Sequence, residues 1–209
     1  MWERMVRHPF VLALGDGSLP RPVFAAYMAQ DYLFVDALVR TVAYGIAKAP
    51  GAAAAKPLGH FLQTLLGAED DLFRRLFATL GVAWPTGAAP EPGPVTRRFG
   101  GFLVRLGRSG SFAEIATALF VTEGTYAEWA TRLVDEGRLP GDALYREWID
   151  IHADASLAEF AAFLGRCMEA PASPAEEERM ERVFARVLRE ELAFWNAFHP
   201  ERRPRGGAR

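Results

Sequence analysis

Residues 111–135 read SFAEIATALFVTEGTYAEWATRLVD and decide the fold class. Apolar or small side chains recur three and four residues apart, which is the repeat of an α-helix with one face in a core. Ser111 followed three residues later by Glu114 is the capping-box pattern that begins a helix. Glu123 interrupts the apolar row at a position that faces the core. That row consists of Phe112, Ala116, Leu119, Tyr126, Ala130 and Leu133.

Apolar residues also recur three and four positions apart through most of the rest of this 209-residue chain. Further helices are predicted at 3–14, 21–48, 52–81, 95–107, 141–168 and 174–198, with Gly and Pro at the breakpoints. No run alternates strictly between apolar and polar residues, as a half-buried strand would. We therefore predict an all-α, single-domain helical bundle over residues 1–200. A linker at 82–94 crosses one end of it, and a disordered basic tail follows at 201–209.

Composition excludes several classes of protein. The chain carries 24 Lys and Arg against 26 Asp and Glu, and it contains one cysteine, Cys167. One cysteine cannot form an internal disulfide or a Cys-rich metal site, so we expect a cytoplasmic protein. The near-neutral charge argues against a nucleic-acid partner, and no segment approaches the ~18 apolar residues of a membrane helix.

Three more predicted helices carry an acid in the apolar row. Desolvating an isolated charge costs several kcal/mol, so each acid needs an explanation. A single one could reach solvent along the edge of its helix or pair with an arginine. Four acids on four helices favour a polar small-molecule pocket inside the bundle. These residues are Asp31, Glu69, Glu123 and Glu191.

The neighbours of these acids argue against a di-metal centre. A di-iron carboxylate bundle needs Glu-x-x-His on two helices. Here the residues three positions after the four acids are Phe34, Leu72, Tyr126 and Phe194. We therefore expect no metal site. Aromatic side chains beside carboxylates suit a flat, amine-bearing heteroaromatic ring.

The histidines and the cysteine are weaker candidates. His152 lies on the Tyr145–Trp148 side of its helix, where it could either line a pocket or be a hydrogen-bonded core residue. His8 precedes Pro9 and could serve as an axial haem ligand, although a structural role fits it better. Cys167 has no nearby base in the sequence and is expected to act as a small buried hydrophobe. His60 and His199 are expected to be structural or solvated.

Five motifs together resemble the TenA/thiaminase II family, in the right order and across nearly the whole chain. The resemblance implies a haem-oxygenase-like helical fold and a homo-oligomer, either dimer or tetramer. It also implies hydrolysis of aminopyrimidines in thiamin salvage without metal, haem or another cofactor. The motifs are His8-Pro-Phe10, Gly15-Asp-Gly-Ser-Leu-Pro20, Gln30-Asp-Tyr-Leu33, Phe112-Ala-Glu-Ile-Ala-Thr-Ala-Leu119 and Glu191-Leu-Ala-Phe-Trp195.

The resemblance also implies roles for single residues. Asp31 matches the aspartate that hydrogen-bonds the aminopyrimidine ring, and Glu191 matches the glutamate that handles protons. Phe34 corresponds to an aromatic residue that stacks on the ring. Tyr126 corresponds to the tyrosine one turn beyond the nucleophile, and His152 to a position often held by tyrosine.

One departure from the family changes the expected chemistry. Thr122 stands where the better-known branch has its nucleophilic cysteine, and Glu123 follows it, as in the branch called TenA-E. We therefore predict a hydrolase that acts on aminomethylpyrimidine or its N-formyl form. Of Glu123 and Glu191, one would be the general base and the other the acid. Asp31 would stay ionised, and Glu69 and Thr122 would contact the substrate.

Two alternatives remain open from the sequence. The chain could be a non-catalytic protein that binds a pyrimidine or a cofactor. It could also be a haem-oxygenase-like protein that uses His8 as the iron ligand.

Overall fold

The computed structural model describes residues 1–82, 91–169 and 171–199, and within these ranges the chain forms helices and no strand. The expected tail at 201–209 and most of the expected linker lie outside the described residues. The elements are α1 (Trp2–Val6), α2 (Pro9–Gly15), α3 (Arg21–Lys48), α4 (Ala52–Thr64), the π-helical η1 (Leu65–Glu69), α5 (Asp70–Leu80), α6 (Pro94–Ser109), α7 (Phe112–Asp135), α8 (Ala143–His152), α9 (Ala155–Met168) and α10 (Pro174–Phe198).

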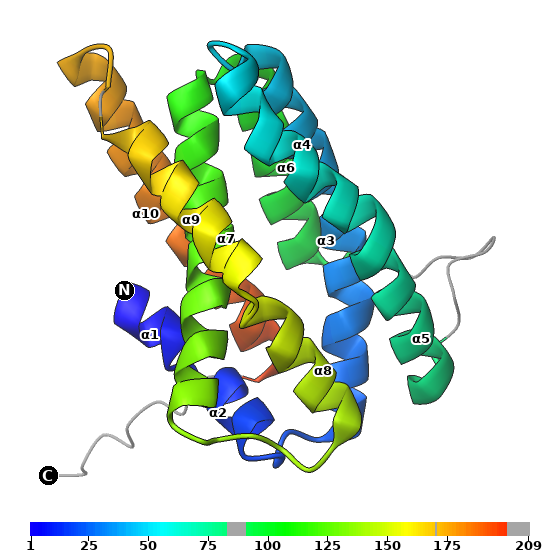
Figure 1. Cartoon of the computed structure of the whole chain (residues 1–209). Helices are drawn as coiled ribbons and strands as arrows, with labels where there is room; N and C mark the ends of the chain where they lie inside the picture. Colours follow the sequence, from blue (N-terminus) through cyan, green and yellow to red (C-terminus); the bar gives the residue numbers. More distant parts are fainter. Residues whose placement is uncertain (83–90, 170, 200–209) are drawn as a thin grey trace, which may run out of the picture.

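The long helices α3, α6, α7 and α10 pack side by side as the centre of the bundle (Figure 1). On one side of this centre, α4, η1 and α5 form a continuous ridge against α3. On the other side, α8 and α9 pack along α7. The two ridges face each other in front of α3 and α7 (Figure 1).

Helix α7 begins where the sequence predicts. The Ser111 hydroxyl accepts a hydrogen bond from the Glu114 amide at 3.2 Å, and the Glu114 carboxylate accepts one from the Ser111 amide at 2.9 Å. Both bonds satisfy amide groups that the first helical turn leaves unpaired. Neighbouring helices bury α7 on most of its circumference, and its apolar row lies in the core.

Two predicted helices are divided in the structure, so their continuity was predicted wrongly. The 3–14 segment breaks at His8, because Pro9 disfavours helical geometry in the residue before it. His8 then caps α2, and its Nδ1 accepts a hydrogen bond from the Phe10 amide at 3.2 Å. The 141–168 segment ends at His152 and restarts after Asp154, whose carboxylate accepts a hydrogen bond from the Ser156 amide at 2.8 Å.

The predicted 52–81 helix is continuous but contains the π-helical turn η1. A π turn widens the helix by one residue, so it shifts every following position around the helix axis. Glu69 is the last residue of this turn, and it keeps part of its surface exposed instead of being fully buried as expected. Single π turns inside α-helices frequently occur at functional sites.

Candidate active site

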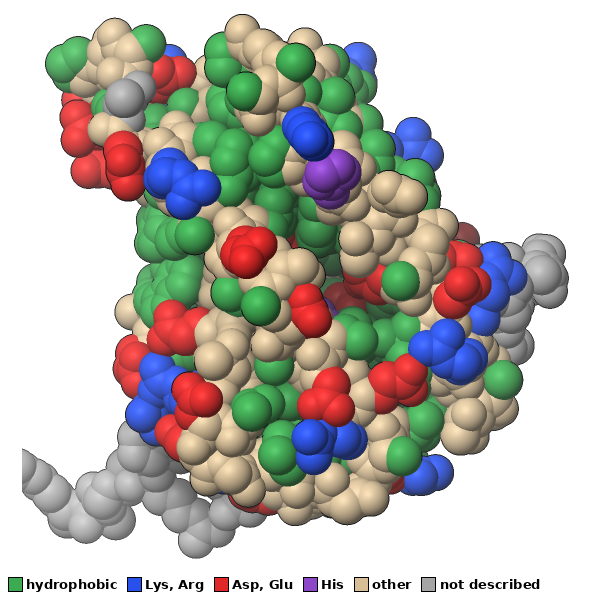
Figure 2. Space-filling view, viewed as in Figure 1, with side chains coloured by type: hydrophobic (Ala, Val, Ile, Leu, Met, Phe, Trp, Pro, Cys, Tyr) green, Lys and Arg blue, Asp and Glu red, His purple; other side chains and the backbone are tan. Residues whose placement is uncertain are grey.

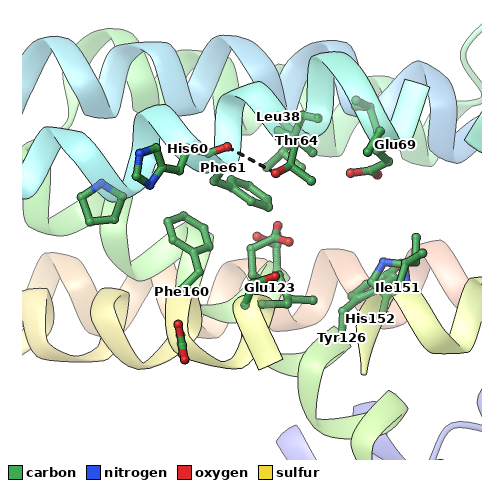
Figure 3. A pocket seen from close by; sticks show the side chains of 18 of the residues that line it. Leu38, His60, Phe61, Thr64, Glu69, Glu123, Tyr126, Ile151, His152 and Phe160 are labelled. Atoms are coloured by element: carbon green, nitrogen blue, oxygen red, sulfur yellow. Dashed lines mark hydrogen bonds between the residues drawn. The ribbon is translucent and has the colours of Figure 1, made fainter. Parts of the chain in front are cut away.

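A cavity of about 500 Å³ opens between the two ridges of the bundle. Its walls come from α3, α4, η1, α5, α7, α8, α9 and α10, and Figure 2 shows it as a hollow with acidic side chains in and around it. This volume is typical of a small-molecule site. Figure 3 shows Glu69 on the α4–η1 side and Glu123 on the α7 side, facing the same space.

All residues that the sequence analysis proposed for the site line this one cavity. Five of the helical elements therefore bring together positions up to 160 residues apart in the sequence. Their individual roles in binding or catalysis stay predictions. The residues are Asp31, Phe34, Glu69, Thr122, Glu123, Tyr126, His152 and Glu191.

The four acids have no ion-pair partner among the described residues. Asp31, Glu123 and Glu191 keep 6%, 8% and 2% of their surface exposed. Within the described ranges, no Lys or Arg side chain forms an ion pair with any of the four. The explanation by arginine pairing is therefore wrong here. Carboxyl groups buried in this way provide hydrogen bonds for a ligand that carries amine or ring-nitrogen groups.

Burial keeps these acids protonated to unusually high pH. Desolvation raises the pKa of Asp31 to about 8, with help from the charge of Glu123. Desolvation also raises the pKa of Glu123 to about 7, partly offset by hydrogen bonding from Thr122. The pKa values of Glu69 and Glu191 lie well above the usual range, because desolvation acts together with the charges of Asp31 and Glu123.

This order of pKa values corrects one expectation. Asp31 was expected to stay ionised, yet in the ligand-free cavity it is mostly protonated at pH 7, because its carboxylate would be desolvated beside a second acid. Glu123 is the acid whose pKa lies nearest neutrality. One carboxylate and several neutral carboxylic acids therefore coexist at pH 7, which supplies both a base and an acid.

Thr122 lies beside Glu123 and is 3% exposed. Its hydroxyl donates a hydrogen bond to the backbone oxygen of Leu119 at 3.1 Å, and it also lies within hydrogen-bond reach of the Glu123 carboxyl, whose pKa it lowers. A hydroxyl has one proton to donate, so that proton is divided between a backbone carbonyl and a carboxyl. This arrangement suits a residue that orients Glu123.

His152 is neutral and belongs both to the core and to the cavity wall. Its Nδ1 donates a hydrogen bond to the Trp148 backbone oxygen at 2.8 Å, and desolvation lowers its pKa to about 4. A neutral imidazole that donates from Nδ1 keeps Nε2 as an acceptor. His152 can thus accept a hydrogen bond from a ligand but carries no charge at pH 7.

Aromatic rings form the apolar walls. Phe34 lies 4.7 Å from Phe99 between ring centroids, so its orientation is held from behind. Near the opening, Phe61 of α4 stacks on Phe160 of α9 with centroids 4.3 Å apart (Figure 3). Neither Phe61 nor Phe160 was recognisable as a cavity residue from the sequence, because an apolar residue in a helical row has the same pattern whether it faces a cavity or the core.

Some sequence candidates lie away from the cavity. His8 is fully buried as the cap of α2 and is not among the lining residues, and Cys167 packs against the core with its pKa raised by burial. His60 is exposed and lines the cavity's outer part. In the described residues, no group of three or more His, Cys, Asp and Glu side chains could hold a metal ion. In the described residues, the four acids therefore line the cavity without forming a cluster that could bind a metal ion.

The chain belongs to the TENA/THI-4/PQQC family, whose model matches residues 1–199. It is 28% identical to an aminopyrimidine aminohydrolase from Halalkalibacterium halodurans, over 97% of this chain and 92% of the relative. A second relative with that name, from Bacillus subtilis, is 28% identical over 93% of this chain and 83% of its own length. The structure of a TenA homologue from P. horikoshii OT3 superposes with a TM-score of 0.84 at 26% identity, covering 96% and 93% of the two chains.

These matches confirm the resemblance drawn from the motifs and the all-α, haem-oxygenase-like fold. In the described part of the chain, no helix combines the length and the apolar character needed to cross a membrane.

Proposed function

We propose that the protein is an aminopyrimidine aminohydrolase of thiamin salvage. Hydroxyl replaces the amino group of an aminomethylpyrimidine, with release of ammonia, or the formamido group of its N-formyl form, with release of formamide. For the free amine, water attacks the methylene carbon, the carbon–nitrogen bond breaks and ammonia leaves. The observation that carries this proposal is that four carboxyls, without an ion-pair partner in the described part of the chain, line an aromatic-walled cavity. The two aminohydrolase relatives support it.

The order of the pKa values assigns the roles of general base and general acid to two of the carboxyls. Glu123, with a pKa of about 7, is the general base that takes a proton from water. Glu191, whose pKa lies well above the usual range, keeps its proton at pH 7 and donates it to the leaving amine. Each contributes roughly 10²–10⁴-fold to the rate, which is the usual range for positioned acids and bases.

The remaining wall residues bind the substrate. A protonated Asp31 donates to a ring nitrogen, and its carbonyl oxygen accepts from the exocyclic amine, so the pair forms without net charge. Phe34 packs on the ring face, while Glu69, Thr122 and Tyr126 complete the wall. His152 Nε2 accepts a hydrogen bond from a ligand N–H group.

The assembly and the compartment are further parts of the proposal. The family resemblance supports a homo-oligomer, dimer or tetramer, and the single Cys167 suits a cytoplasmic protein. The alternative of a haem protein is disfavoured because His8, its proposed ligand, caps α2 and is absent from the cavity lining. Sedimentation of the purified protein measures the oligomeric state directly.

One experiment tests the activity. Purified protein is incubated separately with 4-amino-5-aminomethyl-2-methylpyrimidine, its N-formyl derivative and thiamin, and products are identified by chromatography with an ammonia assay. We expect hydroxymethylpyrimidine from one or both of the first two substrates. Tight binding of these pyrimidines without any product would contradict the enzyme proposal and support a binding protein.

A further inference from the structure

The Tyr126 hydroxyl has two hydrogen-bonding neighbours on the side away from the cavity. Trp195 Nε1 donates to it at 3.2 Å, and the Tyr27 hydroxyl lies 2.9 Å from it. Tyr126 lines the cavity (Figure 3). Tyr27 is fully buried, and neither Tyr27 nor Trp195 is among the lining residues. Two core side chains therefore contact the polar atom of a cavity residue.

The direction of these hydrogen bonds follows from which groups can accept. An indole N–H only donates, so the Tyr126 oxygen accepts from Trp195. If Tyr126 also donated to Tyr27, the Tyr27 proton would have no acceptor among the described residues. The nearby indole nitrogen of Trp148 is a donor as well. A buried donor without a partner is costly, so Tyr27 donates to Tyr126.

We propose that Tyr27 is a positioning residue: together with Trp195 it occupies the acceptor side of the Tyr126 oxygen and holds the Tyr126 O–H toward the cavity. The inference rests on the proposed function for the identity of the ligand, but the direction of the bonds does not depend on it. Tyr126 then presents a hydrogen-bond donor to the ligand. The ligand group that it binds is an acceptor, such as a ring nitrogen, a formyl carbonyl oxygen or a product hydroxyl oxygen.

Carboxyl groups lie near both tyrosines. Desolvation by burial raises the pKa of Tyr126, and the charges of Asp31 and Glu191 raise it further, as they also do for Tyr27. In the ligand-free cavity the carboxyl oxygens are available acceptors. Two donated hydrogen bonds also polarise the Tyr126 O–H and make it a stronger donor than an isolated phenol.

Binding of the product pyrimidine provides the first test. The affinity for 4-amino-5-hydroxymethyl-2-methylpyrimidine is measured by calorimetry for Tyr27→Phe, Tyr126→Phe and the double variant. We expect Tyr27→Phe to weaken binding about three- to tenfold, the value of one neutral hydrogen bond. In the Tyr126→Phe background the same change should have less than about a twofold effect, because Tyr27 acts through Tyr126. If Tyr27→Phe weakens binding by the same factor in the Tyr126→Phe background as in the wild type, the proposal is overturned.

A matched control separates positioning from packing. Tyr145 is also buried, and its hydroxyl donates to the Leu19 backbone oxygen at 2.7 Å away from the cavity. Tyr145→Phe removes an equivalent buried hydroxyl and should leave the affinity unchanged. An equal loss of affinity in Tyr145→Phe would assign the Tyr27 effect to general destabilisation.

A second measurement uses the ligand-free protein, so its result does not depend on whether the proposed function is correct. In NMR spectra of the free protein in water, the Tyr27 hydroxyl proton should exchange slowly and shift upfield in Tyr126→Phe, because it loses its acceptor. An unchanged Tyr27 hydroxyl resonance in that variant would overturn the proposed direction. If the wild type binds no pyrimidine but this shift occurs, the function proposal fails and the hydrogen-bond assignment stands.

Discussion

Asp31 of α3 and Glu123 of α7 face one cavity, and the negative charge of Glu123 helps to raise the pKa of Asp31 to about 8. The two acids therefore resist simultaneous ionisation. Because Glu123 itself has a pKa of about 7, it ionises first as pH rises. This coupling sets the protonation states on which the proposed chemistry depends.

The activity should depend on pH with a defined sign. Glu123 must be ionised to accept a proton, and Glu191 must be protonated to donate one. We expect kcat/KM to rise as pH passes about 7 and to fall at higher pH, where Glu191 loses its proton. Steady-state assays across this range test it, and a flat profile below pH 7 would remove Glu123 as the base.

Glu191→Gln should separate turnover from binding. The amide keeps the shape of the side chain but cannot donate a proton to the leaving amine as an acid does, so kcat should fall by roughly 10²–10⁴-fold. Product affinity should change much less. Glu181→Gln, an exposed change on the same helix, should leave kcat unaltered. Full turnover by Glu191→Gln would refute the assigned role.

Asp31→Asn should stabilise the ligand-free protein. The native state holds the Asp31 proton up to about pH 8, whereas an unperturbed aspartate releases it near 3.8, so the contribution of Asp31 to stability is lost as pH rises between these values. At pH 7.5 the neutral amide should raise the free energy of unfolding by about 1–4 kcal/mol. The gain should shrink toward pH 4.

Chemical denaturation at both pH values measures this gain. The control is Asp36→Asn on the same helix, because Asp36 is exposed and pairs with Arg40 at 2.8 Å. It should give no comparable stabilisation. The same Asp31→Asn protein should bind the pyrimidine product about as tightly as the wild type, since a neutral amide offers the same donor and acceptor pair as the protonated carboxyl. A large loss of affinity in this variant would show that Asp31 binds the ring as a carboxylate.

Two glycines in helices should respond in opposite ways to alanine. A Cβ at Gly107 of α6 would lie 2.7 Å from a ring carbon of Tyr44, so Gly107→Ala should destabilise the fold by about 1–3 kcal/mol. A Cβ at Gly59 of α4 meets nothing within 4 Å. Gly59→Ala should stabilise by about 0.5–1 kcal/mol through helix propensity. Thermal unfolding compares the two, and equal signs would contradict this packing.

Helical period alone predicted the fold class and most of the acids that line the cavity. A residue in the apolar row of a helix must face the inside of the bundle, so Asp31, Glu123 and Glu191 were recognisable without coordinates. Glu69 also lines the cavity, although it is less deeply buried than the other three acids, and the π turn at Leu65–Glu69 was not predicted from the sequence. The breaks at Pro9 and Asp154 were visible as capping residues but were passed over.

The tertiary structure determined which side chains from different helices meet at the cavity, and the sequence pattern of a single helix holds no information on this. Sequence spacing orders residues along one helix, but the relative rotation of different helices depends on how all their side chains pack. Packing therefore selected which apolar rings, such as Phe61 and Phe160, face the cavity instead of the core. It also placed Tyr27 and Trp195 behind Tyr126, and it buried the acids, whose pKa values desolvation raises. The sequence by itself determined the helices and the buried acids, and long-range packing turned those acids into a site.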